Sequence, residues 1–276
     1  MTTYIPSWIY QQFDADYTLD HPAEGYGGWK KIDAPFDLDK CAVVLMHAWE
    51  LQSFEEIPGH WRCVDYIPRA EAICKDLLPP FLAKVRKSGI LLIHVGDAAQ
   101  DISHYPGYKA AKALAGENTV NYPRISRGEA VEELAALKHK YGHPGEHNAA
   151  DIEKGRKMGF DFNKHVRPIN DEYVATNSEQ LYRICEKHGV DHLIYTGFAI
   201  NFCLMTSPGG WVDMTRRGVT CSAVKELVTA VENRESIGNE LHKEYGLWNL
   251  SLNSGVVLEE KDLSKALCAC LGKKNG

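Results

Sequence analysis

The stretch that decides the fold is residues 192–203, HLIYTGFAINFC. Its first five residues are a short, mostly apolar run with isoleucine, tyrosine and threonine, which predicts a buried strand. Gly197 follows this run, and the segment after it ends on Cys203. Open parallel sheets bind their ligands at the carboxyl ends of the strands. The pattern therefore places a thiol where a ligand is expected.

Outward from this strand, apolar runs alternate with patterns of helical period. We expect strands at residues 41–46, 90–95 and 219–224, and helices at 68–87, 126–141 and 177–188. Asn177 or Ser178 would cap the last helix, and Gly189 would stop it. Continuously apolar strands separated by helices indicate a parallel sheet covered on both faces. The predicted fold class is α/β, a three-layer α/β/α sandwich with a mostly parallel central sheet, over residues 38–276.

Two segments do not fit this alternation. Residues 1–37 are rich in aromatic side chains without periodicity, and Gly25, Gly27, Gly28 and Pro35 should break any helix or strand. We expect an N-terminal arm that packs on the domain or on a neighbouring subunit. Residues 142–165 are polar and glycine-rich, too long for an ordinary connection. This segment is predicted to be a functional lid, an oligomer contact or a mobile loop.

Composition narrows the class of protein. The 276 residues include 31 basic and 37 acidic side chains, a net charge of −6, which disfavours binding to nucleic acid. The eight cysteines form no Cys-x-x-Cys pair, and no apolar run is long enough to span a membrane. The first residues lack the pattern of a signal peptide. We expect a reduced, cytoplasmic protein with a small-molecule substrate and neither a nucleic-acid nor a membrane partner.

Two predicted strands end in side chains that suit nucleophilic catalysis. The strand at 192–196 leads to Cys203, and the strand at 41–46 leads directly to His47. An imidazole beside a thiol is a common way to generate a thiolate nucleophile. Amide groups at the start of a helix stabilise such an anion and donate hydrogen bonds to an oxyanion. A core thiol and a satisfied core histidine are the alternative interpretations of these two residues.

The sequence TGFAINFC resembles the nucleophile motif of the isochorismatase-like cysteine hydrolases, a superfamily that includes nicotinamidases and carbamoylsarcosine and ureidoacrylate amidohydrolases. The resemblance continues in order through AVVLMHAW, GILLIHVGD and the segment that precedes the motif. It implies a Cys–Asp–Lys triad. Cys203 matches the nucleophile, but His47 occupies the aspartate position and Arg167 the lysine position. It also implies a homo-oligomer and no organic cofactor, and we expect no metal at the site.

The same resemblance implies a cis peptide bond between Ala199 and Ile200, with the amides of Ala199, Ile200 and Cys203 as oxyanion donors. Arg167 would keep His47 neutral and stabilise the Cys203 thiolate. His47 would then take the thiol proton and return it to a leaving amine. We expect hydrolysis of a small amide, ureide or carbamoyl compound through a Cys203 thioester. The alternative is a catalytically decayed relative that binds a small molecule or serves as a scaffold.

Further side chains are candidates for the walls of the substrate pocket. They lie after predicted strands or in the segment that precedes the nucleophile: Trp49, His94, Asp97, Tyr173 and Trp211. Pro208, Gly209 and Gly210 should interrupt the helix after Cys203 and open space near Trp211. Arg167 has an alternative as a surface partner of Asp171 or Glu172. Weaker metal hypotheses rest on two sets of residues: His139, His143 and His147; and Asp97, Asp101 and His104.

Overall fold

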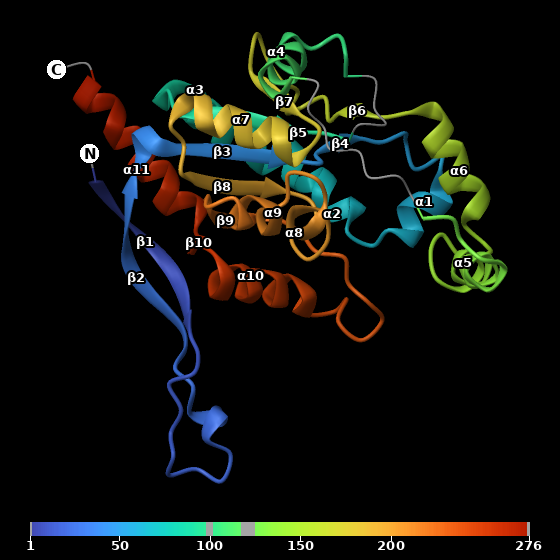
Figure 1. Cartoon of the computed structure of the whole chain (residues 1–276), viewed down its shortest axis with the longest axis horizontal. Helices are drawn as coiled ribbons and strands as arrows, with labels where there is room; N and C mark the ends of the chain where they lie inside the picture. Colours follow the sequence, from blue (N-terminus) through green and yellow to red (C-terminus); the bar gives the residue numbers. More distant parts are fainter. Residues whose placement is uncertain (1, 98–101, 117–124, 275–276) are drawn as a thin grey trace.

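The computed structural model describes residues 2–97, 102–116 and 125–274, and its core is one eight-stranded sheet covered by helices on both faces (Figure 1). A run of neighbouring strands in this sheet is parallel, in the spatial order β10 (Val257–Leu258), β9 (Thr220–Val228), β8 (His192–Gly197), β3 (Cys41–Met46), β5 (Leu91–Val95) and β7 (Tyr173–Ala175). The predicted three-layer α/β/α sandwich with a mostly parallel sheet is confirmed.

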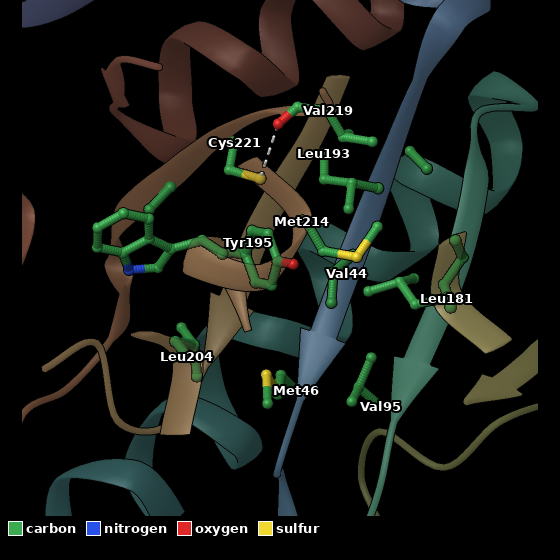
Figure 2. Packing of buried hydrophobic residues seen from close by; sticks show 14 of the residues in the cluster. Val44, Met46, Val95, Leu181, Leu193, Tyr195, Leu204, Met214, Val219 and Cys221 are labelled. Atoms are coloured by element: carbon green, nitrogen blue, oxygen red, sulfur yellow. Dashed lines mark hydrogen bonds between the residues drawn. The ribbon is translucent and has the colours of Figure 1, made fainter. Parts of the chain in front are cut away.

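Strand β3 lies inside the sheet, and its side chains alternate between two cores. Val44 and Met46 face one cluster, which Figure 2 shows packed with Leu181 and Met214. The helices on that face are α4 (Pro106–Ala115), α7 (Ser178–His188), α9 (Trp211–Arg216) and α10 (Leu241–Asn253). Val43 faces the other cluster, under α3 (Leu78–Ser88) and α11 (Glu260–Lys274). Burial on both faces explains why the strand sequences are continuously apolar.

The predicted helices are present, with boundaries set by local chemistry. The side chain of Asn177 accepts a hydrogen bond from the Gln180 amide at 2.9 Å, and Gly189 ends α7 at a φ of 64°. The helix expected at 68–87 is divided into α2 (Ile67–Ala72), a π-helical turn η3 (Ile73–Leu77) and α3. Two prolines stand in the first turn of α3, where a missing amide hydrogen costs no helical bond. The helix expected at 126–141 is α5 (Glu129–Tyr141).

The N-terminal segment is regular, and the prediction that it would hold no strand was wrong. Strands β1 (Thr2–Gln11) and β2 (Gly28–Asp37) form an antiparallel hairpin, and β1 pairs with β10 at the edge of the central sheet. Gly25 lies in a short 3₁₀ turn, η1 (Pro22–Gly25), at the end of the hairpin. Pro35 lies on the outermost strand, where a residue without an amide hydrogen is tolerated. A second 3₁₀ turn, η2 (Leu38–Lys40), leads into β3.

The segment 142–165 forms a wall beside the carboxyl ends of the parallel strands. Its helix α6 (Ala149–Met158) packs on α1 (Pro58–Cys63), and its strand β6 (Asp161–Phe162) pairs with β4 (Trp49–Glu50). In Figure 1 these elements lie together, with α5, at the end of the sheet opposite the N-terminal hairpin. No helix in the described ranges has the length and apolar character needed to cross a membrane.

Candidate active site

The candidate active site lies where the strand order of the sheet reverses. From β3 the chain crosses to β5 and β7 on one side, and it then returns to β8 and β9 on the other. The Phe198 amide donates to the Met46 carbonyl at 3.0 Å, and the His47 amide donates to the Val95 carbonyl at 2.9 Å. The chain segments leaving β3 and β8 are thereby held side by side. Crevices of open α/β sheets form at such switch points.

A cavity of about 530 Å³ opens at this point, and Cys203 and His47 both line it. Its other walls are contributed by the turns after β3 and β8 and by α1, α2 and α6, and they include Trp49, His60, Cys63, Asp65, Tyr66, Glu71, His143, Ile152, Arg156, Phe160, Phe198, Ala199, Phe202 and Glu232. The mixture of aromatic walls with a few polar groups, and the volume, suit a small organic ligand.

Cys203 is half-buried at the first residue of the short helix α8 (Cys203–Thr206), which ends before Pro208. The turn before it depends on Gly197, at a φ of 107°, because a Cβ atom there would lie 2.0 Å from the Met46 carbonyl oxygen. The amides of Ala199 and Cys203 have no acceptor among the described residues, so both are available to an oxyanion.

Two details of this turn differ from the prediction. The cis peptide bond joins Phe198 and Ala199, one residue earlier than expected between Ala199 and Ile200. The Ile200 amide donates to the Thr229 carbonyl at 2.8 Å. Because that hydrogen bond occupies its hydrogen, Ile200 is not an oxyanion donor, and this expectation was wrong. Local sequence could not predict this contact, because Thr229 follows β9, the next strand of the sheet.

His47 occupies the left-handed region, at a φ of 55°, and its imidazole stacks on Trp49 with ring centroids 4.6 Å apart. The residue is only 8% exposed. This burial lowers the pKa of His47 to about 4, although the nearby negative charge of Asp97 acts in the opposite direction. At neutral pH the imidazole is therefore neutral and can accept a proton. Burial therefore keeps His47 neutral, which is the first of the two effects expected of Arg167.

The structure does not bring Arg167 into the cavity with Cys203 and His47. Its Nε donates to the Phe162 carbonyl at 3.1 Å and lies 3.4 Å from Asp161 Oδ2, and the side chain is 47% exposed. Arg167 is a surface ion-pair partner, as the alternative prediction had it, but its carboxylate is neither Asp171 nor Glu172. Glu172 is instead paired with Arg86 at 2.6 Å.

Among the predicted pocket residues, only Trp49 lines the cavity. Asp97 does not line it, but its negative charge acts to raise the pKa of His47. His94 is fully buried and donates to Glu172 at 3.0 Å. The Tyr173 hydroxyl contacts Lys187 and His188. Trp211 begins α9 and is buried in the core, so the prediction of ligand space near it was wrong. A new helix, α9, does begin after Pro208, as predicted. The indole of Trp211 at its first position points into the hydrophobic core and not into the cavity.

Tyr66, which the sequence analysis did not single out, lies close to Cys203. Burial first, and then the negative charges of Cys203 and Asp65, raise the pKa of Tyr66 above its ordinary value. The Tyr66 hydroxyl therefore remains protonated, and it has no hydrogen-bond partner within the part of the chain that the structure describes. A protonated hydroxyl beside the thiol is a further candidate donor to an oxyanion. The only feature of the sequence that could have pointed to Tyr66 is that an aromatic residue stands just before the helix predicted at 68–87.

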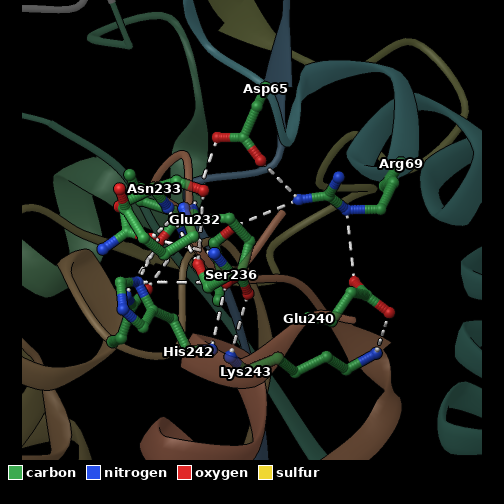
Figure 3. Close-up of polar contacts among 12 residues, drawn as sticks. Asp65, Arg69, Glu232, Asn233, Ser236, Glu240, His242 and Lys243 are labelled. Atoms are coloured by element: carbon green, nitrogen blue, oxygen red, sulfur yellow. Dashed lines mark hydrogen bonds and ion pairs between the residues drawn. The ribbon is translucent and has the colours of Figure 1, made fainter. Parts of the chain in front are cut away.

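The carboxylates that line the cavity already have donors. Asp65 pairs with Arg69 at 2.7 Å, and buried Glu232 accepts the backbone amides of His242 and Lys243 at 3.0 Å each (Figure 3). Glu71 accepts a hydrogen bond from the Asn163 side chain at 2.8 Å. These contacts fix the carboxylates in structural roles. His47 lines the same cavity as Cys203 and is neutral at pH 7, so it is the candidate base for the thiol.

The described residues contain no group of three or more His, Cys, Asp or Glu side chains arranged to hold a metal ion. The hypothesis built on His139, His143 and His147 gains no support from the structure. Asp101, which the other metal hypothesis requires together with Asp97 and His104, lies outside the described residues.

No protein family model and no curated protein matches this chain. Solved structures do resemble it. A cysteine hydrolase from Pseudomonas syringae pv. phaseolicola 1448A is 11% identical, with 85% of this chain and 95% of that chain covered and a TM-score of 0.48. An isochorismatase-like hydrolase from Alkaliphilus metalliredigens is 19% identical, with 82% and 98% covered and a TM-score of 0.47.

A third similar structure is N-carbamoylsarcosine amidase from Thermoplasma acidophilum, which is 15% identical, with 80% of this chain and 96% of that chain covered and a TM-score of 0.40. The chain is thus similar to solved isochorismatase-family hydrolases, the group whose motif residues 196–203 resemble. At these identities and TM-scores, the similarity assigns no activity to this chain.

Proposed function

We propose that this protein is an isochorismatase-like cysteine hydrolase that cleaves a C–N bond in a small amide, ureide or carbamoyl compound through a thioester on Cys203. The observation that carries the proposal is the meeting of Cys203 and His47 in one cavity of about 530 Å³ at the carboxyl ends of β8 and β3. The two residues are far apart in the sequence, and a cavity that accommodates a small ligand contains both.

In the acylation half of the reaction, neutral His47 takes the proton of the Cys203 thiol, and the sulfur attacks the carbonyl carbon of the substrate. The oxyanion that forms accepts hydrogen bonds from the amides of Ala199 and Cys203 and from the Tyr66 hydroxyl. The C–N bond then breaks, and the leaving nitrogen receives the proton from His47. The products of this half are a free amine or ammonia and a thioester on Cys203.

In the second half, water attacks the thioester carbon and gives a proton to His47. The C–S bond breaks, the acid is released, and the proton returns to the Cys203 sulfur. A low pKa makes the His47 imidazolium a strong acid toward a leaving amine, while the buried imidazole remains neutral between the two transfers. Arg167 has no part in this mechanism, since it is paired with Asp161 outside the cavity.

A small-molecule binding protein is the second candidate, and the position of Arg167 favours it. The resemblance implies a cation beside the nucleophile, and in this chain the aligned arginine does not line the cavity. A decayed catalytic set would keep the cavity but would leave the Cys203 thiol unactivated. The two candidates therefore differ in the reactivity of one sulfur.

Alkylation by iodoacetamide near neutral pH, with the modified cysteines identified by mass spectrometry, tests the proposal. Cys63 lines the same cavity and Cys268 is exposed, so these two thiols are internal controls for access. We expect Cys203 to react at least about tenfold faster than either of them. His47→Asn should remove this advantage without changing the rates of Cys63 and Cys268. Equal rates at the three thiols in the wild-type protein would favour the binding protein.

A screen for ammonia release from small amides, ureides and carbamoyl compounds identifies the substrate. Cys203→Ala should abolish release from any compound that the wild-type protein hydrolyses, and Cys63→Ala is the matched control. Turnover that persists in Cys203→Ala would refute the thioester mechanism.

A further inference from the structure

The turn that carries the nucleophile (residues 198–203, the thiol turn) is hydrogen-bonded to the segment that follows β9. The side chain of Asn201 makes two of these bonds: its Nδ2 donates to the Val231 carbonyl at 2.9 Å, and its Oδ1 accepts from the Val231 amide at 2.9 Å. One residue earlier, the Ile200 amide donates to the Thr229 carbonyl at 2.8 Å. Asn201 is thus a clamp between two segments that lie 30 residues apart in the sequence.

The segment after β9 is joined in turn to the residue that precedes Tyr66. The Glu232 amide donates to Asp65 Oδ1 at 3.4 Å. Asp65 pairs with Arg69, whose guanidinium donates to the Ala230 carbonyl at 3.3 Å. Figure 3 shows Asp65 and Arg69 beside Glu232 in this network. Because Tyr66 directly follows Asp65, the network connects the thiol turn to the hydroxyl that is proposed as an oxyanion donor.

Helix α10 supports both of the clamped segments. A Cβ atom on Gly246 would lie 2.8 Å from Ile200 Cγ2 and 3.3 Å from the Asn201 nitrogen, so the helix backbone packs directly against the thiol turn. At the start of the same helix, His242 Nδ1 lies 3.1 Å from the Val231 carbonyl oxygen. The helix therefore restrains where each segment lies, and the two bonds of Asn201 align one segment with the other.

The two ends of this network carry the groups that stabilise an oxyanion in the proposed mechanism. The amides of Ala199 and Cys203 belong to the thiol turn, and Tyr66 stands at the start of α2. All three residues line the cavity, whereas Asn201 lies outside its lining. Donors on separate elements stabilise a transition state only if their relative position is fixed before the reaction.

We infer that Asn201 is a positioning residue for the oxyanion site. By clamping Val231, it holds the Tyr66 hydroxyl in alignment with the two amides of the thiol turn. The inference rests on the proposed function for the identity of these donors. Asn201 makes no contact with the substrate and acts through Tyr66. Loss of the clamp should therefore weaken the stabilisation of an oxyanion without changing the Cys203 thiol itself.

Reversible addition of an aldehyde to Cys203 tests this inference without a substrate, with acetaldehyde and benzaldehyde as the probes. The sulfur forms a bond to the carbonyl carbon, and the thiol proton passes to the carbonyl oxygen, which then lies where the oxyanion would form. Affinity is measured as protection of Cys203 from iodoacetamide, by mass spectrometry, with Cys63 and Cys268 as control thiols. Alkylation forms no oxyanion, so its rate without aldehyde depends on the thiol alone.

Asn201→Ala should weaken aldehyde binding by about tenfold, the effect of losing one hydrogen bond to the adduct oxygen, and should leave the alkylation rate of Cys203 within about twofold of the wild-type rate. Asn201→Asp keeps the shape and the acceptor for the Val231 amide but loses the donor, so it should weaken binding as well, and it serves if the alanine variant does not fold. In the Tyr66→Phe background the positioned hydroxyl is absent, so Asn201→Ala should have almost no further effect.

Asn177→Ala is the matched control, because it removes an asparagine that also bonds to the backbone, as the cap of α7, away from the cavity. This variant should lose stability in thermal unfolding and keep the wild-type affinity for both aldehydes. Thermal unfolding also verifies the fold of each Asn201 variant.

The inference is overturned if Asn201→Ala binds both aldehydes as tightly as the wild-type protein, if its full loss persists in the Tyr66→Phe background, or if the alkylation rate falls as much as the affinity. Wild-type Cys203 that neither aldehyde protects would also overturn it, because no oxyanion site would then exist. Turnover is judged separately: the expected pattern in a protein that hydrolyses no amide, ureide or carbamoyl compound would refute the proposed function and leave the role of Asn201 standing.

Discussion

The guanidinium Nε of Arg167 lies 3.4 Å from Asp161 Oδ2, and this ion pair holds the arginine on the surface rather than in the cavity of Cys203. Asp161 belongs to β6, and β6 pairs with β4 immediately after His47. Arg167 thus ties the segment that follows β6 back to β6 itself. The catalytic chemistry proposed for this chain consequently depends on His47 and Tyr66, which line the same cavity as the Cys203 thiol.

Arg167→Gln should leave catalysis nearly unchanged. Because the ion pair is half-exposed, its loss should lower the free energy of unfolding by less than about 1 kcal/mol. We expect kcat/KM to stay within about threefold of the wild-type value. The measurement is steady-state turnover of the substrate found by the ammonia screen. A loss of a hundredfold or more would return Arg167 to the mechanism.

His47→Asn should lower kcat by about 10²- to 10⁴-fold, since it removes the general base. Asparagine tolerates the left-handed backbone found at φ 55°, so the substitution does not strain the loop. His47→Asp supplies a carboxylate that can accept the proton and should recover part of the rate. Equal activity of the asparagine variant and the wild-type protein would exclude His47 as the base.

The acid limb of the pH profile should reflect the low pKa of His47. Wild-type kcat/KM should hold as the pH is lowered past 6.5 and fall only as the pH approaches about 4, where buried His47 takes up a proton. Between these two values the unfolded chain binds a proton at this residue and the folded chain does not, so stability falls as the pH is lowered. Circular dichroism at each pH separates this loss from the loss of rate. An acid limb centred near pH 6.5 would contradict the burial of His47.

Tyr66→Phe should lower kcat by about tenfold or more with little change in KM, because its hydroxyl is proposed to donate only to the oxyanion. Stability should not change measurably, since that hydroxyl has no partner in the described part of the chain. Tyr173→Phe is the matched control: the same atom is removed where the hydroxyl contacts Lys187 and His188. A larger effect at Tyr173 than at Tyr66 would refute this role.

Glu172→Gln should destabilise the fold by about 2–4 kcal/mol at pH 7, because buried His94 and Arg86 both lose a charged acceptor. Burial raises the pKa of Glu172, but hydrogen bonds from His94 and Arg86 outweigh it and lower the pKa to about 2. The folded pKa lies below the ordinary value of 4.5, so this stabilisation is complete above pH 4.5 and is lost as the pH falls toward 2.

Urea denaturation of the wild-type protein and the Glu172→Gln variant across this pH range measures the effect. Asp171→Asn, at the exposed neighbouring position, controls for the loss of one negative charge. A Glu172→Gln variant that matches the wild-type stability at pH 7 would show that the cluster contributes little.

The sequence by itself determined the layered fold and two residues of the site. Apolar runs and helical periods are local properties, and they predicted β3, β5, β8 and α7 close to their final bounds, while β9 continues to Val228, beyond its predicted end at residue 224. Parallel strands share one carboxyl edge, so residues that follow two such strands, as His47 follows β3 and Cys203 follows β8 after a short turn, are brought to the same edge by the topology alone. This is why the positions of His47 and Cys203 could be anticipated.

Tertiary structure alone decided the contacts that side chains make from loops and irregular turns. Arg167 forms an ion pair with Asp161, and the Ile200 amide donates to the Thr229 carbonyl. The Trp211 indole packs in the core. Each of these contacts depends on residues outside the element that carries the side chain or amide. The pairing of β1 with β2 likewise depends on register between two segments that local pattern did not reveal. Local propensity fixes the backbone state of a segment, whereas the direction of a side chain is fixed by packing and hydrogen bonding across the chain. The cavity and the position of Tyr66 therefore appear only once the elements are assembled.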